Sequence, residues 1–323
     1  MREKMSTKSR LLKLLEQEKG RYLSGEILAE QLQVSRTAVW KAIQSLRQEG
    51  YEIQAVTNKG YALDKACDVL SAEAIQSGLE HPEVKVQVFR EIASTSLAMK
   101  QMALESRLPH GSMVIANGQT KGKGRKGRDF YSPKDSGLYL SVLLYPDKTV
   151  RESLELTAEA AVAVCRAVEK CCKISLKIKW VNDLYLEEKK VCGILTEAVT
   201  DLETGDIEFV VVGIGLNLKS PEEGFPEEIR QKAGVVLPAG EAVDRNQLAA
   251  TIVNELLKET EKKGIPKEYI RNNLVPGRTI CLVQGTDRRI VKAEEILPDG
   301  RLLIQNEQGR EEILSGADVS LEL

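Results

Sequence analysis

The sequence predicts an α+β multidomain protein, on three observations. Its 323 residues exceed the length of one typical domain, and an apolar fraction of 42% is enough to fill two or three cores. Residues 1–66 combine short amphipathic helices with a hairpin, whereas residues 67–275 mix strands, hairpins and helices. Residues 276–323 contain short strands separated by turns. We therefore expect three domains with these boundaries.

Residues 1–66 have the element order of a winged helix-turn-helix. The segments SRLLKLLEQ and SGEILAEQL predict two amphipathic helices, and VSRTAVWKAIQSLRQEG predicts a third from a Ser35 cap to Gly50. The next segment, YEIQAVTNKGYAL, alternates polar and apolar residues around Asn58-Lys59-Gly60, which is typical of a β-hairpin. Residues 1–66 together hold 12 Lys and Arg against 8 Asp and Glu, so this part is basic, whereas the whole chain has a net charge of -2.

The third predicted helix carries a polar, partly cationic face near its N-terminus. In a helix-turn-helix protein this end contacts base edges in the major groove, and cations nearby neutralise phosphates. A winged helix that binds protein, or a solvated helix face, would present the same types of residue. The candidate DNA contacts are Ser35, Arg36, Thr37, Lys41, Gln44 and, at the hairpin tip, Lys59.

Strands and helices alternate through the central segment, after a linker predicted at residues 67–75. The predicted strands are VKVQVFREI, GSMVIANGQ, GLYLSVLLYP, KISLKIKW, DLYLEEKKVCGILTEAV and IEFVVVGIGLNL. The predicted helices are STSLAMKQMALES, which opens at a Ser94/Thr95 cap, LELTAEAAVAVCRAVEKCC and RNQLAATIVNELLKETEKK. This order favours a mixed sheet over a doubly wound one. Short strands after Pro276 predict a small β-barrel.

Composition argues against several classes of protein. The longest apolar runs are far shorter than the roughly 20 residues that span a bilayer, and MREKMSTKSR lacks the apolar core of a signal peptide. These features predict a cytoplasmic protein without a membrane partner. The six cysteines form no C-x-x-C pair and the two histidines have no ligand-like flanks, so the sequence predicts no protein metal site and disfavours Ser-His catalysis.

Residues 119–130, QTKGKGRKGRDF, place five cationic side chains among three glycines. The loop does not fit the P-loop pattern, because Arg128-Asp129 follows Gly127 where that pattern needs Lys and then Ser or Thr. It does not fit the dinucleotide-binding fingerprint either, because DFYSPKDSG follows where that fingerprint needs a helix. Glycines allow backbone N–H groups to approach an anion, and Lys and Arg add charge-assisted hydrogen bonds. An anion site is therefore one interpretation, and a solvated loop or an auxiliary nucleic-acid patch is the other.

Taken together, these segments resemble the bifunctional biotin protein ligases that also repress biotin operons. KGKGRKGR stands where this family has GRGRRGR, and KWVNDLYLEEKKVCGIL resembles K-W-P-N-D followed by K-x-x-G-I-L. GIGLNL matches G-x-G-x-N, and STS at 94–96 supplies a Ser-Thr pair. Val181 replaces the usual proline, Ser96 a frequent asparagine, and Phe130 falls near a tryptophan of some relatives. The resemblance covers essentially the whole chain and implies a class II synthetase-like ligase core followed by an SH3-like barrel.

The resemblance also implies a reaction that uses ATP and Mg²⁺. The biotin carboxylate attacks the α-phosphate of ATP to form biotinyl-5′-AMP, and a lysine amine of a biotin carboxyl carrier protein domain then attacks the acyl carbon. Fixed cations would offset the repulsion between the two anions of the first step. The implied catalytic residues are Lys190, Arg125 and Asp183. The implied biotin and adenylate contacts are Ser94, Thr95, Ser96, Gln119, Gly122, Lys123, Gly124, Arg125, Arg128, Trp180, Asn182, Lys190, Gly193, Gly213, Gly215 and Asn217.

Repression is the second implied function. Biotinyl-5′-AMP would act as corepressor by promoting a homodimer, which places two recognition helices on operator DNA. Two other functions stay open on the residues alone. One is a transcription factor whose body senses a small anion without catalysis, and the other is a ligase for lipoate or another acyl group.

Overall fold

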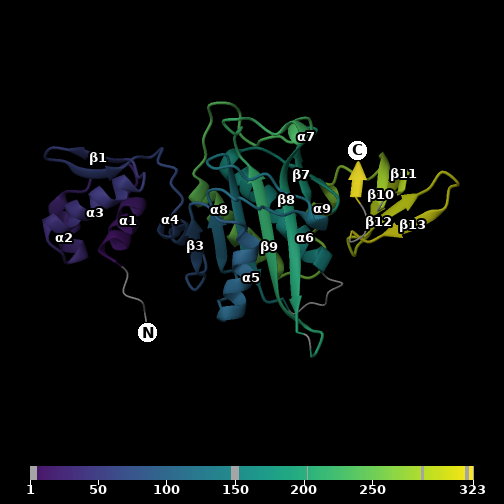
Figure 1. Ribbon diagram of the computed structural model, residues 1–323, viewed down its shortest axis with the longest axis horizontal. Coiled ribbons are helices and arrows are strands. Elements are labelled where there is room, and N and C mark those ends of the chain that lie inside the picture. Colours follow the sequence, from purple (N-terminus) through teal and green to yellow (C-terminus); the bar gives the residue numbers. More distant parts are fainter. Residues whose placement is uncertain (1–5, 147–152, 202, 285–286, 317–319, 323) are drawn as a thin grey trace. The chain divides into compact units, whose positions relative to one another are not determined.

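In the computed structural model, which describes residues 6–146, 153–201, 203–284, 287–316 and 320–322, the chain divides into two compact units (Figure 1). The small unit contains the described residues up to Pro82 together with Ala242–Ala250. The large unit contains Glu83–Glu241 and the described residues from Thr251 onward. Both combine helices and strands, so the predicted α+β class is confirmed. The division into three domains stays a prediction.

The small unit has the predicted order of three helices and a hairpin. Serine side chains cap all three helices, because Ser6, Ser24 and Ser35 accept hydrogen bonds from backbone N–H groups three residues later. Leucine and isoleucine side chains from each helix fill one core, with Leu11 and Leu28 fully buried. The elements are α1 (Thr7–Gln17), α2 (Gly25–Leu32), α3 (Arg36–Gln48), β1 (Ile53–Val56) and β2 (Gly60–Leu63).

The predicted linker at residues 67–75 is wrong in part, because a helix begins within it. Helix α4 (Ala72–Gly78) has Ser71 as its N-cap, whose hydroxyl accepts a hydrogen bond from the Ala74 N–H at 3.0 Å. Asn246, at the start of α8 (Arg245–Thr260), accepts from the Ser71 N–H at 2.9 Å and donates to the Val69 carbonyl at 3.0 Å. The partner lies 175 residues away in sequence, so local periodicity carries no signal of this contact.

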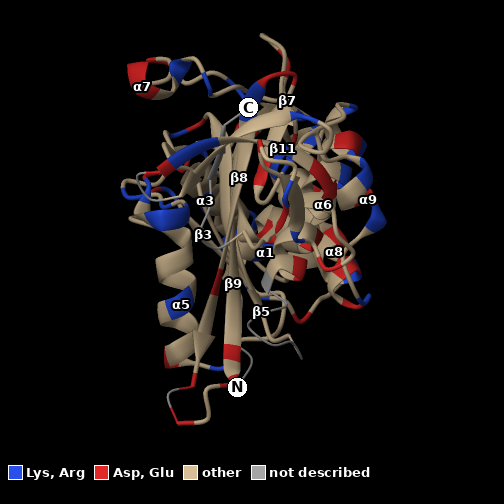
Figure 2. Ribbon diagram, turned by 90° about the vertical axis from the view of Figure 1, so that its right-hand side faces the viewer, with Lys and Arg blue, Asp and Glu red and all other residues tan. Residues whose placement is uncertain are grey.

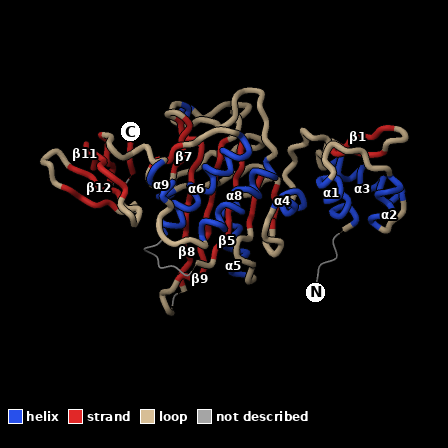
Figure 3. Tube along the Cα trace, turned by 180° about the vertical axis from the view of Figure 1, so that it is seen from behind, coloured by secondary structure: helices blue, strands red, loops and turns tan. Residues whose placement is uncertain are grey.

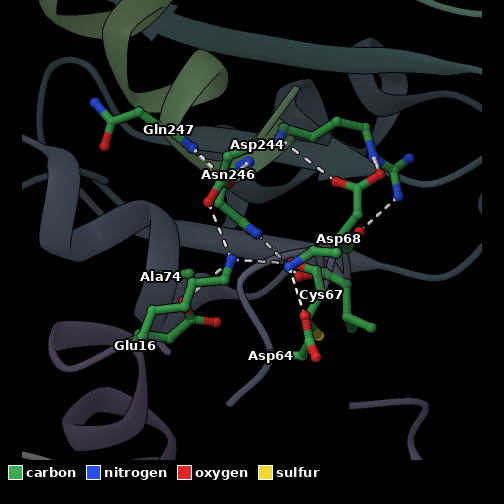
Figure 4. Close-up of polar contacts among 12 residues, drawn as sticks. Glu16, Asp64, Cys67, Asp68, Ala74, Asp244, Asn246 and Gln247 are labelled. Carbon is green, nitrogen blue, oxygen red and sulfur yellow. Dashed lines mark hydrogen bonds and ion pairs between the residues drawn. The ribbon is translucent and has the colours of Figure 1, made fainter. Parts of the chain in front are cut away.

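Charged side chains complete this polar cluster in the small unit (Figure 4). The Arg245 guanidinium donates to the Asp68 carboxylate at 2.8 Å, and the Lys19 ammonium donates to Asp244 at 3.0 Å and to the Cys67 carbonyl at 2.9 Å. Glu16 lies beside Lys19, at 3.8 Å, with only 6% of its side chain exposed. Burial raises the pKa of the Glu16 carboxyl to about 7, against the attraction of Lys19.

A seven-stranded mixed sheet forms the centre of the large unit, in the order β3-β4-β5-β9-β8-β7-β6. Only the β3–β4 pair is parallel among these described strands, which confirms the predicted mixed sheet. The strands are β3 (Val86–Phe89), β4 (Met113–Ala116), β5 (Gly137–Leu144), β6 (Lys177–Lys179), β7 (Asp183–Leu186), β8 (Lys189–Thr200) and β9 (Ile207–Asn217).

Helices cover both faces of this sheet (Figures 1 and 3). Helix α5 (Thr95–Glu105) packs on one face, where Met99 meets Val114, Leu143 and Phe209, and α6 (Ser153–Cys172) covers the other. All eight residues of β5 are buried as a result. Figure 2 shows that Lys, Arg, Asp and Glu lie mainly on the helices and loops around the sheet. The middle of β9, by contrast, is apolar and buried.

Two sequence expectations differ from this sheet. Residues 183–199 form a hairpin rather than one strand, because the chain turns at Glu187, whose φ is 54°. The segment KISLKIKW contributes a strand only over Lys177–Lys179. Short helices α7 (Glu227–Arg230) and α9 (Lys267–Arg271) were not predicted, because four or five residues hold too little periodicity to detect.

The C-terminal segment forms a five-stranded antiparallel sheet in the order β13-β12-β11-β10-β14. Its predicted turn at Pro298-Asp299-Gly300 joins β11 to β12, and Gly300 adopts a φ of +83° there. The strands are β10 (Thr279–Gln284), β11 (Asp287–Ile296), β12 (Leu302–Gln305), β13 (Glu311–Leu314) and β14 (Ser320–Glu322). Across the described ranges, no helix is long and apolar enough to cross a membrane.

Candidate active site

A cavity in the large unit gathers residues from segments that lie far apart in the sequence. It is lined by the N-terminus of α5, the basic glycine loop, the turn before β7, and strands β8 and β9. Most predicted ligand contacts meet here. The predicted residues that line it are Ser94, Thr95, Ser96, Gln119, Lys123, Gly124, Arg125, Arg128, Trp180, Asn182, Asp183, Lys190, Gly193, Gly213 and Gly215.

Glycines of two neighbouring strands form one wall of the cavity. Gly193 of β8 pairs with Gly215 of β9, and the Phe130 ring lies against both. A Cβ atom on Gly215 would lie 2.4 Å from Phe130 Cε1, and one on Gly213 would lie 2.6 Å from Ser96 Oγ. Real Cβ atoms do not approach other atoms so closely, so these positions need glycine for the ring and the hydroxyl to reach the sheet.

A network of hydroxyl and amide groups forms the next wall. Thr95 Oγ1 and Ser96 Oγ lie 2.8 and 3.0 Å from Ser141 Oγ, which projects from the middle of β5. The side-chain oxygen of Gln119, Oε1, accepts from the Thr95 backbone N–H at 2.8 Å, and the side-chain amide nitrogen donates to Ser132 Oγ at 2.9 Å. These bonds hold polar atoms in fixed directions at a buried site, as recognition of a small polar ring system requires.

The basic glycine loop closes on itself as a turn. The Gly124 N–H donates to the Arg128 carbonyl at 2.8 Å, and Lys123 pairs with Asp129 at 2.7 Å on an exposed surface. Arg125 begins a single 3-10 turn (Arg125–Gly127) and points its guanidinium at Asn182 Oδ1, 3.2 Å away. Burial lowers the pKa of Arg125, and the nearby Asp183 carboxylate opposes that shift. The loop therefore brings the Arg125 guanidinium to Asn182, while Lys123, Lys126 and Arg128 of the same loop also line the cavity.

Another cation enters from β8. The Lys190 ammonium lies 2.6 Å from Asp183 Oδ1, with 34% and 23% of the two side chains exposed. This contact is an ion pair rather than a well-angled hydrogen bond, since Asp183 Oδ1 is buried and has no hydrogen-bond partner among the described residues. The Asn182 side-chain amide is held by the hydrogen bond that it donates to the Ile194 carbonyl at 2.7 Å. Lys190 and Arg125 thus flank one Asn-Asp pair.

The segment before this pair is fixed by the C-terminal part of the large unit. Trp180, only 4% exposed, donates its indole N–H to the Gly300 carbonyl at 2.8 Å. The Val181 carbonyl accepts from the buried Tyr269 hydroxyl at 2.9 Å, and the Trp180–Val181 peptide bond is cis. Burial raises the pKa of Tyr269, which keeps the phenol protonated as a donor. These partners come from α9 and from the turn before β12.

Two predicted residues lie outside the lining that the described chain forms. Gly122 supports the loop, since its carbonyl accepts from the Phe130 N–H at 2.9 Å, and the Asn217 amide donates to the Gly234 carbonyl at 3.1 Å. Sequence reasoning missed several lining residues and the Ser141 and Ser132 hydroxyls. One serine inside the otherwise apolar GLYLSVLLY was an available signal. The missed lining residues are Lys126, Asp129, Phe130, Lys179, Ile194, Leu195 and Ile214.

The predicted DNA contacts belong to the small unit. Arg36, Thr37 and Lys41 are exposed on α3, and Lys59 is exposed at the hairpin tip. Gln44 is partly buried, and the Ser35 hydroxyl caps α3 by accepting from the Ala38 N–H at 3.2 Å. In the portion of the chain that the structure describes, no group of three His, Cys, Asp or Glu could hold a metal ion.

Comparisons with known proteins match both units. A sequence model of the Biotin/lipoate A/B protein ligase family matches residues 88–217, and one of a helix-turn-helix (HTH) domain matches residues 7–62. The Bifunctional ligase/repressor BirA of Bacillus subtilis is 34% identical over 326 residues, covering 96% of this chain and 97% of the relative. That of Escherichia coli is 30% identical and covers 89% of each chain.

A solved structure is similar to most of this chain. The biotin protein ligase from Aquifex aeolicus, in complex with biotin and ATP, is 28% identical with a TM-score of 0.61. The match covers 73% of this chain and 98% of that one. Because similarity to the bifunctional relatives extends through both the helix-turn-helix and the sheet, the chain belongs to the BirA family of bifunctional ligase/repressors.

Proposed function

We propose that this protein joins biotin to a lysine of a biotin carboxyl carrier protein domain, through biotinyl-5′-AMP, and represses biotin genes by binding operator DNA. The observation that carries the ligase proposal is the convergence of Lys190 and Arg125 on Asn182 and Asp183 beside a hydroxyl-lined cavity. Family membership supports both activities.

The first step joins two anions, and the two cations suit it. An oxygen of the biotin carboxylate attacks the α-phosphorus of ATP, a P–O bond forms, and pyrophosphate leaves with the electrons of the broken bond. Lys190 and Arg125 approach the cavity centre from different segments, so they can contact the carboxylate and the α-phosphate together. Such prepositioned charge stabilises the extra charge of the transition state without reorganisation.

The second step transfers biotin to the carrier. The ε-amine of the carrier lysine attacks the acyl carbon, a C–N bond forms, and AMP leaves with the electrons of the C–O bond. Asp183 is the carboxylate closest to Lys190, and we assign it to position the incoming amine and take its proton. Arg125, which reaches over the cavity from the loop, retains the adenylate until the carrier arrives.

Hydrogen bonds select biotin in this proposal. Thr95, Ser96, Gln119 and Ser141 form a linked set of donors and acceptors against the glycine wall, which suits the polar ureido ring of biotin. Lipoate has no ureido ring and would make none of the hydrogen bonds that this set offers to a ligand, which disfavours it.

Magnesium would accompany ATP rather than occupy a protein cage. The cavity lining contains two carboxylates, Asp129 and Asp183, too few for a dedicated site but enough to assist an ion held by phosphates and water. The ion would supply charge neutralisation at the phosphates.

Repression follows from the small unit. We propose that Ser35, Arg36, Thr37, Lys41 and Gln44 of α3 face the major groove, with Lys59 at a phosphate. Biotinyl-5′-AMP acts as corepressor by promoting a homodimer, so that two α3 helices meet two half-sites. Adenylate that leaves the dimerisation constant unchanged would contradict this part of the proposal.

The test is carrier modification followed by mass spectrometry. Purified protein with biotin, Mg·ATP and an apo carrier domain should add one biotin to the carrier, and lipoate at equal concentration should compete poorly. Lys190→Ala should abolish the gain in mass, whereas Lys189→Ala, which removes the exposed neighbouring lysine, should preserve it. If the wild-type protein binds biotin but the carrier gains no mass, the large unit is a biotin sensor and not a ligase.

A further inference from the structure

The centre of helix α3 exposes a large aromatic side chain that the proposed DNA contacts do not include. Trp40 is 51% exposed, although α3 already buries Val39, Ile43 and Leu46 completely in the core of the small unit. The indole therefore adds little to the packing of the helix. Tryptophan is enriched at interfaces, because its indole combines a large apolar surface with a polar N–H.

Trp40 lies on the same face of α3 as the cationic residues. Arg36 is four residues before it and Thr37 three residues before it, spacings that place side chains next to each other on a helix. Arg36, Thr37 and Lys41 are all exposed. The indole is thus surrounded by groups that bind phosphates and base edges, not by other exposed apolar residues of α3. Its surroundings fit DNA better than a protein partner.

We infer that Trp40 contacts the C5-methyl group of a thymine in the major groove and determines base preference at one position of each half-site. This inference rests on the proposed DNA-binding function and identifies a specificity residue within it. Apolar side chains recognise thymine in the major groove through this methyl group, which no other base carries. Arg36 and Lys41 then act mainly as sequence-independent phosphate contacts.

The first measurement is selection of binding sequences from a pool of duplexes with a randomised centre, about 40 base pairs long to admit two half-sites. It uses the full-length protein with biotin and Mg·ATP. The wild-type protein should select a sequence with a thymine repeated once in each half-site. Trp40→Ala should lose preference at that base pair alone and bind the selected duplex about tenfold more weakly.

The second measurement isolates the methyl group. Deoxyuridine in place of the selected thymine removes only the methyl, and should weaken binding to the wild-type protein about threefold to fivefold. Binding of Trp40→Ala should be insensitive to the same change, because the side chain that contacts the methyl is already absent. Trp40→Phe, which keeps an apolar ring, should retain part of the sensitivity.

Two controls keep the outcome specific. Ile27→Ala removes another exposed apolar side chain, 45% exposed on α2, and should leave the base preference unchanged. The second control uses tryptophan fluorescence. The chain has two tryptophans, and Trp180 is buried in the large unit. Quenching of the emission by DNA in wild type, but not in Trp40→Phe, therefore reports on the indole of α3.

Three results would overturn the inference. Equal sensitivity of wild type and Trp40→Ala to deoxyuridine would show that another group contacts the methyl. A change in dimerisation by Trp40→Ala with unaltered base preference would assign the indole to a protein contact. Failure of the wild-type protein to select any sequence would refute DNA binding itself, an outcome distinct from a failure of the Trp40 assignment.

Discussion

Removal of the Lys190 ammonium is expected to have the largest effect on adenylate formation. In Lys190→Ala the cavity loses a cation, and the Asp183 carboxylate loses the ammonium that lies 2.6 Å from its Oδ1, which leaves Arg125 to offset its charge. Both changes act in the same direction, because the first step brings the biotin carboxylate and the ATP phosphates together. The variant should retain its fold, since the side chain is 34% exposed and supports no core packing.

The size of the effect follows from Coulomb's law. Unit charges about 4 Å apart interact by about 4 kcal/mol at the effective dielectric constant of about 20 that suits a partly exposed site. That energy, if it is realised only in the transition state, corresponds to about a 1,000-fold change in rate. Repulsion from Asp183 adds to the loss. Lys190→Ala should therefore slow adenylate formation at least about 1,000-fold.

Pyrophosphate release at saturating biotin and Mg·ATP measures this step apart from transfer to the carrier. Lys189→Ala is the matched control and should remain close to wild type, because that side chain is exposed. Lys190→Ala combined with Asp183→Asn should recover part of the rate of pyrophosphate release, since the second change removes the negative charge that Lys190 no longer offsets. A rate for Lys190→Ala within tenfold of wild type, or a double variant no faster than the single one, would refute the electrostatic reasoning.

Three further predictions concern the glycine wall, the hydroxyl network and the small unit. Gly215→Ala should weaken biotin binding by at least tenfold in calorimetry, because its Cβ would lie 2.4 Å from Phe130, and Phe130→Ala should relieve part of that loss. Ser141→Ala should raise the dissociation constant for biotin about fivefold, since Thr95 loses a hydrogen-bond partner at 2.8 Å; an unchanged value would remove Ser141 from the recognition network. The pKa of Glu16 is raised from 4.5 to about 7, so its contribution to stability is complete below pH 4.5 and is lost as the pH rises through 7. Denaturant unfolding should accordingly show Glu16→Gln more stable than wild type by about 1 to 2 kcal/mol at pH 8, with the difference vanishing near pH 4; a pH-independent difference would contradict the shift.

Local features of the chain were predictable because their causes are local. Ser24, Ser35 and Ser94 cap helices at the positions where a short polar side chain precedes an amphipathic segment. The hairpin tip at Lys59 follows from the turn residues Asn58-Lys59-Gly60, and the strands pair up to Val56 and Gly60. In each case the hydrogen bond joins groups within three or four residues, so periodicity and turn chemistry are sufficient to identify it.

Much of the candidate site was also predictable, though by resemblance rather than by periodicity. The residues Lys190, Arg125 and Gly215 belong to motifs whose types and spacing survive in this chain, and the structure brings them to one cavity. A cationic side chain can bind an anion, and a glycine can leave room for a neighbouring group, in any fold. Asn217, predicted on the same grounds, instead supports the loop at Gly234 and is not part of the described lining.

Sequence alone therefore determined the fold class, the caps and the residues that carry charge into the site. Tertiary structure alone decided which distant groups hold them in place: Gly300 fixes the Trp180 indole, and Asn246 fixes the chain before α4 across 175 residues. Such contacts depend on how strands and helices pack, and each partner is an ordinary turn or cap residue in its own sequence neighbourhood. These hydrogen bonds stabilise the fold mainly where burial excludes competing water. Burial of this kind cannot be recognised from a local sequence pattern.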